Sequence, residues 1–284
     1  MSLIESSVVT DSICSLNNTQ PDKGCIPESV IAEEFKDKSL DNLYKNTSCN
    51  NISENGEKQL CLMEKLDKKD ILIKYFKPVT KSFSHSHWLN NTEIDTVQYQ
   101  FYVSYEGYYY SNIHMIDFGM FNPSNSEHIG YEPENIKNID FYKELKGEGN
   151  LSDNGPLKKY GIVVNTDVSS GSGIHWFAIF IDFTGRDINI EYFNSSGYDI
   201  KDRSFKEFFI NLADKLSFQT GRKCNFIKVS DIQHQNSGTS NCGVYALYYI
   251  WKRLGGESID FFKKNKIDDN HIVLFRKYFF RKSE

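Results

Sequence analysis

A cysteine at the start of an apolar helix is the residue of this chain best placed to act as a nucleophile. Cys242 is followed by Gly243 and by a run in which apolar residues recur at helical spacing up to Leu254. A thiol at a helix N-terminus feels the positive end of the helix dipole and the free N–H groups of the first turn. Such surroundings lower a cysteine pKa from about 8.5 into a range of about 3.5–7.5, and the thiolate is the reactive form. A buried, unreactive thiol is the alternative interpretation of Cys242 taken by itself.

His175 is the expected general base for this thiol. It opens residues 175–183, which have the composition of a buried strand, so its ring is expected at the edge of a sheet. From there an imidazole can accept the proton of a thiol at a helix start. His87 is also followed by a tryptophan, but no apolar strand follows it, and we expect it to pack on the surface or in the core.

Asn194 is the expected third member of the site. It ends the next predicted strand, residues 188–193, which a short turn joins to the strand of His175. Two strands joined in this way form a hairpin, in which the end of one lies beside the start of the other. Asn194 can then accept a hydrogen bond from the imidazole N–H and orient the ring. Asp199 is the alternative orienting residue.

A polar loop before Cys242 is expected to supply the oxyanion hole. Gln235 lies in a Gly- and Ser-containing stretch that can bend tightly. Its side-chain amide can donate to an oxyanion together with the backbone N–H of Cys242. Gln233, His234 and Asn236 are alternatives for this polar role. The predicted chemistry is hydrolysis of a peptide bond by a cysteine nucleophile.

This order of residues resembles that of the adenovirus-type and SUMO-deconjugating cysteine proteases. The likeness is greatest to polyprotein-processing proteases of the African swine fever virus type, in which Asn also stands at the place of Asn194, whereas most of the wider family has Asp. The spacing from Gln235 to Cys242 is one residue longer than in the viral type and equals that of the adenovirus enzymes. The likeness covers residues 86–284 and rests on residues 164–176, 190–197, 234–243 and 275–281.

The resemblance implies a fold, a reaction and a setting. The fold would be α+β, with a papain-like core in which helices flank a central mixed sheet, and with an added N-terminal arm. The partners would be viral polyproteins, cleaved after Gly-Gly at Gly-Gly-Xaa sites during maturation of the virion core, in the host cytoplasm and the virion. Trp176 would line a narrow tunnel that admits only glycines, and Asn165 would join the substrate-binding residues. No cofactor, metal, nucleic acid or membrane is implied.

Two other functions would use the same fold. The first is a deubiquitinating or SUMO-deconjugating isopeptidase, since these modifiers also end in Gly-Gly. The second is a non-catalytic binding module that keeps a protease fold. Activation by DNA, as in adenovirus, is disfavoured by a net charge of −5, because nucleic-acid binders tend to be basic.

The elements that must position these residues fall in the second part of the chain. Composition changes near residue 80, which predicts an arm at residues 1–85, with helices at 28–45 and 57–76, and a protease core at 86–284. In the core we expect strands at 160–166, 175–183, 188–193 and 228–232, and helices at 202–219 and 242–254. Strands and helices that do not alternate strictly favour an α+β fold.

Cysteine usage and composition limit the remaining possibilities. The chain has six cysteines among 284 residues and no Cys-x-x-Cys pair, so no zinc site is indicated. Four cysteines precede residue 62, which leaves an N-terminal disulfide possible. No signal peptide is visible, however, so we expect a reducing cytoplasm in which disulfides are rare. No apolar run approaches the ~20 residues of a membrane span. The tyrosine-rich tract 99–110 is interpreted as core packing, with a substrate groove as the alternative.

Overall fold

The computed structural model describes residues 12–16, 23–36, 38–119, 136, 139–229 and 231–282. The chain divides into two compact units, residues 1–82 with 276–284, and residues 83–275. The second unit holds every residue for which the sequence predicts a catalytic or binding role. Residues 276–284, which the predicted domain boundaries place with the protease core, group with the N-terminal unit.

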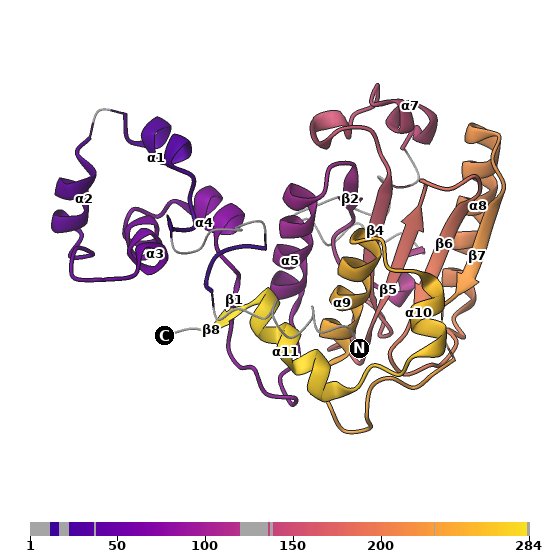
Figure 1. Ribbon diagram of the computed structural model, residues 1–284. Coiled ribbons are helices and arrows are strands. Elements are labelled where there is room, and N and C mark those ends of the chain that lie inside the picture. Colours follow the sequence, from indigo (N-terminus) through magenta and orange to yellow (C-terminus); the bar gives the residue numbers. More distant parts are fainter. Residues whose placement is uncertain are drawn as a thin grey trace. The chain divides into compact units, whose positions relative to one another are not determined.

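The first unit is mostly helical, and each of its two predicted helices is interrupted. Ser39 caps a new helix by accepting a hydrogen bond from the Asn42 N–H, and Asp67 has a positive φ of 50° that ends the third. Residues 79–80 and 281–282 pair in parallel as a two-stranded sheet. Its elements are α1 (Glu28–Glu34), α2 (Leu40–Asn46), α3 (Asn55–Lys65), α4 (Lys69–Tyr75), β1 (Val79–Thr80) and β8 (Arg281–Lys282) (Figure 1).

Two disulfides cross-link this unit, which corrects the expectation that its cysteines are reduced. Cys14 is bonded to Cys25 and Cys49 to Cys61, with Cα–Cα distances of 4.9 and 5.9 Å. The unit buries a small cluster of apolar side chains. Units of this size rarely gain enough stability from a core alone, and cross-links that constrain the unfolded chain compensate.

We expect each disulfide to stabilise the first unit by about 3 kcal/mol, because each closes a loop of 11 or 12 residues. The double variant Cys14→Ser with Cys25→Ser, and the corresponding pair at 49 and 61, should each lower the free energy of unfolding by this amount. This free energy is measured by chemical denaturation, with the unfolded fraction of the first unit read from limited proteolysis within residues 1–82 at each denaturant concentration. Cys224→Ser is the control, since Cys224 is in no disulfide. Four free thiols in non-reducing peptide mapping would contradict the assignment.

A six-stranded mixed sheet forms the centre of the second unit. Five strands follow the order β2-β4-β5-β6-β7, and β3 also pairs with β4. The β4–β5 and β5–β6 pairs are antiparallel, and the other pairs are parallel. The strands are β2 (Tyr108–Tyr110), β3 (His114–Met115), β4 (Lys159–Asn165), β5 (Trp176–Asp182), β6 (Ile188–Phe193) and β7 (Cys224–Lys228).

Most predicted core elements are present, and the α+β fold is confirmed. Strands predicted at 160–166, 175–183 and 188–193 correspond to β4, β5 and β6. The strand predicted at 228–232 is wrong, because the chain pairs with β6 over β7, at Cys224–Lys228. β7 is an edge strand with half-exposed side chains, so it lacks the apolar pattern that marks the central strands.

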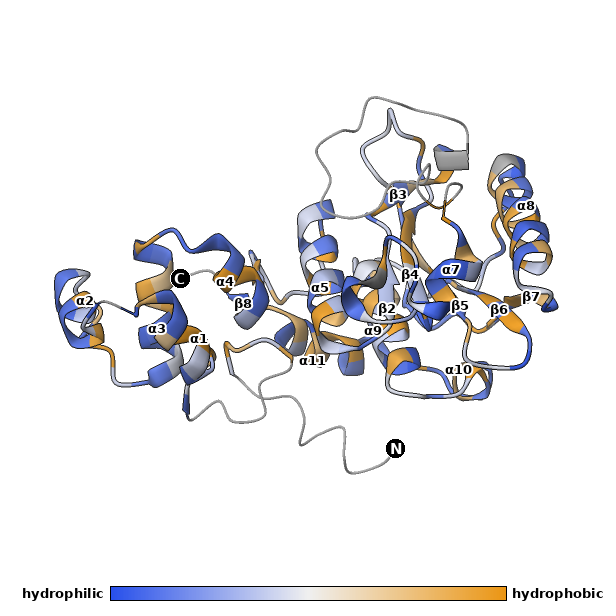
Figure 2. Cartoon of the chain, turned by 90° about the horizontal axis from the view of Figure 1, so that it is seen from above, coloured by the Kyte–Doolittle hydropathy of each residue, from blue (hydrophilic) through white to orange (hydrophobic). Residues whose placement is uncertain are grey.

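Helices cover both faces of the sheet (Figure 1), and Figure 2 shows α8 and α10 on opposite sides of it. Alternate residues of β5, including Phe177 and Ile179, pack with Phe205 and Phe209 of α8 in one core cluster. On the other face, Phe193 of β6 stacks on Tyr249 of α9 with ring centroids 4.5 Å apart. The helices are α5 (Asn91–Ser104), α7 (Phe141–Lys146), α8 (Arg203–Thr220), α9 (Cys242–Leu254), α10 (Ile259–Lys264) and α11 (Asp269–Phe279).

The tyrosine-rich tract contributes to the core. Its first part ends α5, and its last part is strand β2. Tyr108 and Tyr109 are buried, and their hydroxyls donate to Gln98 Oε1 at 3.0 Å and to the Gly155 carbonyl at 2.7 Å. Among the described residues, none of the helices has the length and apolarity needed to cross a bilayer.

Candidate active site

The start of β5 and the end of β6 bring His175 and Asn194 together. The Nε2–H of His175 donates to Asn194 Oδ1 at 2.7 Å. The antiparallel register pairs Ala178 with Phe193, so residues just before β5 lie beside residues just after β6. This is the hairpin geometry that the sequence predicts. Because Nε2 is engaged, Nδ1 is the ring nitrogen left to accept a proton.

Other hydrogen bonds fix the orientation of the Asn194 amide. Its Oδ1 also accepts from the Ser196 N–H at 2.9 Å, and its Nδ2 donates to Tyr192 Oη at 2.8 Å and to the Tyr198 carbonyl at 3.2 Å. The rival Asp199 is exposed and pairs with Lys228 at 2.8 Å, which lowers the pKa of that carboxyl. Asn194, and not Asp199, therefore contacts the imidazole.

The environment of His175 favours the neutral ring. Burial lowers the pKa of His175 below its ordinary value, while the hydrogen bond to Asn194 opposes this shift. A neutral imidazole can accept a proton, so this environment suits a general base at neutral pH.

Cys242 begins α9, whose first turn packs on the residue that follows His175. Cys242 is 1% exposed and is in no disulfide. A Cβ added to Gly243 would lie 3.3 Å from Trp176 Cδ1, so the first turn of α9 packs closely on the residue after His175. The first turn of α9 contains no acidic residue. A thiolate at this position therefore benefits from the helix dipole without a like charge in the same turn.

The loop before Cys242 turns Gln235 inward. Gln235 is 8% exposed, and its Nε2 donates to the Thr239 carbonyl at 2.6 Å while its Oε1 accepts from Ser195 Oγ at 2.8 Å. Asn236, the alternative, is exposed. His234 is fully buried, and its Nδ1 accepts the Ile267 N–H at 3.2 Å. This burial lowers the pKa of His234 to about 4, so that ring stays neutral in the core.

Trp176 and Asn165 are both buried near His175. The Trp176 indole N–H donates to the Leu89 carbonyl at 3.1 Å. Asn165 Oδ1 accepts from the Ile174 N–H at 2.9 Å and the Asp167 N–H at 3.0 Å, so it closes the loop that leads to His175. Roles of these two residues in substrate binding stay predictions.

Residues 85–89, for which the sequence predicts no catalytic or binding role, also border the start of α9. A Cβ at Gly243 would lie 3.2 Å from Leu89, and the His85 carbonyl accepts the Ser240 N–H at 2.6 Å. His87 is half-buried and pairs with Glu93 at 3.1 Å, as expected of a packing residue. Trp88, which lies between His87 and Leu89 in the sequence, is 42% exposed. Trp88 is one of only three tryptophans in the chain, and this rare residue was the feature of the sequence that could have indicated a role for residues 85–89.

The C-terminal two-thirds of the chain matches a known protease family. Residues 87–284 match the model described as the Ulp1 protease family, C-terminal catalytic domain. The chain belongs to this family. It is therefore a cysteine-type peptidase, as the order of His175, Asn194 and Cys242 predicts.

Viral relatives match almost the whole chain. The SUMO-1 cysteine protease of African swine fever virus (isolate Pig/Kenya/KEN-50/1950) is 28% identical over 286 residues, which cover 99% of each chain. A crystal structure of the African swine fever virus protease superposes with a TM-score of 0.68 and 26% identity, over 96% of this chain and 97% of that one. A protein of Acanthamoeba polyphaga mimivirus, named as a thiol protease, is 27% identical over 75% of this chain and 63% of its own length.

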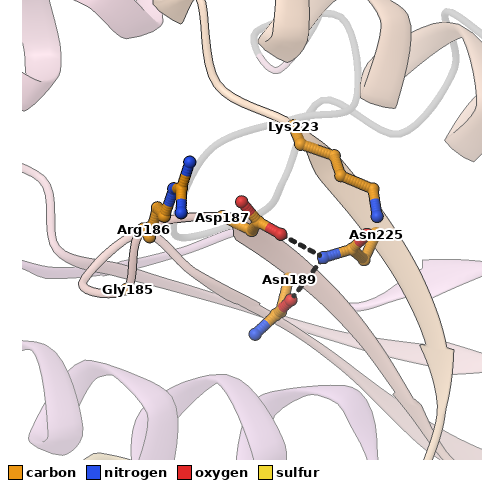
Figure 3. Close-up of a pocket in the computed structure, with 6 residues that line it drawn as sticks. All are labelled: Gly185, Arg186, Asp187, Asn189, Lys223 and Asn225. Atoms are coloured by element: carbon orange, nitrogen blue, oxygen red, sulfur yellow. Dashed lines mark hydrogen bonds between the residues drawn. The ribbon is translucent and has the colours of Figure 1, made fainter.

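A polar surface hollow of about 540 Å³ lies at the other end of strands β5 and β6 from His175 and Asn194. Figure 3 shows this hollow at the β5–β6 turn and the start of β7, where Asn225 Nδ2 donates to Asp187 and Asn189. It contains none of the predicted catalytic residues. Among the described residues, no group of three or more His, Cys, Asp or Glu side chains is arranged to hold a metal ion.

We expect iodoacetamide to alkylate Cys242 much faster than Cys224. Burial raises the pKa of Cys224 to about 11, so that thiol is largely protonated at neutral pH. His175→Ala should slow alkylation of Cys242 roughly 30-fold at pH 7, because an unassisted thiol of pKa about 8.5 is only ~3% thiolate. Mass spectrometry of the two cysteine peptides over time measures both rates, and equal rates would exclude an activated nucleophile.

We expect Asn194→Ala to lower kcat/KM by roughly 10- to 100-fold, the effect of losing one hydrogen bond to a charged ring. The same change should lower the pKa of His175 further, because the Asn194 acceptor favours the protonated imidazole. NMR titration of His175 measures this shift. Asp199→Ala is the matched control and should leave both quantities unchanged. Full activity of Asn194→Ala with an inactive Asp199→Ala would reverse the assignment.

Proposed function

We propose that this protein is an endopeptidase that cleaves viral polyproteins after Gly-Gly during maturation of the virion core, in the host cytoplasm and the virion. The observation that carries the proposal is the 2.7 Å hydrogen bond between His175 and Asn194, beside the helix start that bears Cys242. The relatives support the setting, since they are named as proteases of African swine fever virus and of a mimivirus.

The proposed reaction begins with the thiolate of Cys242, whose proton is held on Nδ1 of His175. The thiolate attacks the carbonyl carbon of the second glycine, and the amide N–H of Gln235 and the backbone N–H of Cys242 stabilise the oxyanion. His175 then returns the proton to the leaving amine, and the C–N bond breaks. Water, deprotonated by His175, hydrolyses the resulting thioester and regenerates the thiol. Asn194 keeps the imidazole in one orientation throughout.

Close packing around the nucleophile supports selection of glycine. Gly243 already lies so near Leu89 and Trp176 that even a methyl group there would contact both at 3.2–3.3 Å. Trp176 is buried against the carbonyl of Leu89, and the exposed Trp88 precedes Leu89. We propose that the substrate passes along this wall, where a side chain on either of the two residues before the cleaved bond would collide.

We expect a peptide with a Gly-Gly-Xaa site to be cleaved about 10- to 100-fold faster than its Gly-Ala-Xaa counterpart, the range for one extra methyl group in a tightly packed site. Cys242→Ala should abolish cleavage. Fluorogenic ubiquitin and SUMO substrates are assayed in parallel, since these modifiers also end in Gly-Gly. Cleavage of the modifiers alone would establish an isopeptidase instead, and cleavage of no substrate would favour a binding module.

A further inference from the structure

A single buried carboxylate holds the loop that precedes the nucleophile. Asp269, the first residue of α11, is 3% exposed. Its Oδ2 accepts the backbone N–H of Asn236 at 2.7 Å. Its Oδ1 accepts from Thr239 Oγ1 at 2.9 Å and from Asn241 Nδ2 at 2.5 Å. The three donors span the loop from the residue after Gln235 to the residue before Cys242.

These contacts reach both proposed oxyanion donors. The carbonyl of Thr239 accepts the side-chain amide of Gln235 at 2.6 Å, while the hydroxyl of the same Thr239 is held by Asp269. Asn241 is fully buried, and the peptide that follows it carries the N–H of Cys242. The position of each donor is therefore tied to a residue that Asp269 binds directly.

The chemistry of the contacts requires a carboxylate. The Asn236 N–H faces one oxygen and the Asn241 amide faces the other, and both groups only donate, so both oxygens at position 269 must accept. The Thr239 hydroxyl lies within reach of Asp269 Oδ1 and of the Asn236 carbonyl. An asparagine there has nearly the same shape, but its NH₂ group would face a donor on one side of the fork. Asp269→Asn therefore breaks part of the network without creating a cavity.

We propose that Asp269 is a positioning residue for the oxyanion hole, which it organises through Thr239 and Asn241. The proposal rests on the function proposed above. Asp269 acts through geometry and touches no reacting atom. Its loss should impair only steps in which an oxyanion forms.

Two reactions of Cys242 separate this role from a general structural one. Peptide hydrolysis passes through an oxyanion, whereas alkylation by iodoacetamide displaces iodide at a saturated carbon and forms none. In the full chain, Asp269→Asn should lower kcat about 100-fold, the usual effect of losing an oxyanion donor, with little change in KM. The alkylation rate of Cys242 and its pH profile should stay within about twofold of wild type.

Asp268→Asn is the matched control. Asp268 is the exposed neighbour, which accepts the His271 N–H at 2.9 Å and makes none of the loop contacts described above. Its kinetics should equal those of wild type. Thr239→Val removes one of the three contacts from a half-buried position and serves as the test if Asp269→Asn fails to fold. It should lower kcat for hydrolysis by less than about 100-fold and leave the alkylation rate of Cys242 unchanged.

The proposal is overturned if hydrolysis and alkylation fall together in the folded variants, or if hydrolysis is unchanged. The assay uses whichever amide substrate the wild-type enzyme hydrolyses fastest. A wild type that prefers ubiquitin or SUMO would therefore refute the Gly-Gly polyprotein function and leave the test of Asp269 intact.

Discussion

A buried ionic contact joins α9, the helix that begins with the nucleophile, to β6. Glu191 is fully buried, accepts two hydrogen bonds from the Arg253 guanidinium at 2.8 Å and a third from Tyr249 Oη at 2.5 Å. Removing one partner of such a pair costs about 3–5 kcal/mol, because it leaves a buried charge unpaired. From Tyr249 the helix rises about 10 Å to Cys242, and from Glu191 the strand rises about 10 Å to Asn194. Because the two distances are similar, the first residue of α9 and the residue that follows β6 lie about equally far from this ionic contact.

Before the substrate is attacked, the charges of the proposed reaction lie on the thiol and the imidazole. Burial keeps His175 neutral until a proton arrives, and Asn194 then accepts a hydrogen bond from the protonated ring without adding a negative charge. An aspartate in this place would favour the imidazolium more strongly. The nucleophile lies at a helix start, a position that favours the thiolate in general, so a neutral orienting residue is consistent with the proposed chemistry.

The parts of the site that depend on local pattern could be predicted, and those that depend on distant contacts could not. The apolar alternation of β5 and β6 and the turn between them were enough to place His175 beside Asn194. Helix α5 was missed because polar residues are buried beside its apolar Ile94, Val97 and Phe101, which weakens the apolar pattern. Strand β7 was misplaced because it is a half-exposed edge. The hydrogen bonds of Asp269 to residues 236–241 join positions about thirty residues apart in the sequence. A hydrophobic pattern along the chain cannot predict such a contact.

Two buried carboxylates, Glu191 and Asp269, thus support the site from either end of its scaffold without entering the chemistry. Each accepts three hydrogen bonds, so its charge is balanced by fixed donors and not by the catalytic imidazole. An unsatisfied carboxylate at either place would be an unpaired buried charge, which destabilises the fold. Satisfied carboxylates instead give rigid anchors, because bonds to a charged acceptor are stronger than bonds between neutral groups. Directional contacts of this kind allow an oxyanion hole to be built on a loop, where backbone alone would not hold its donors in place.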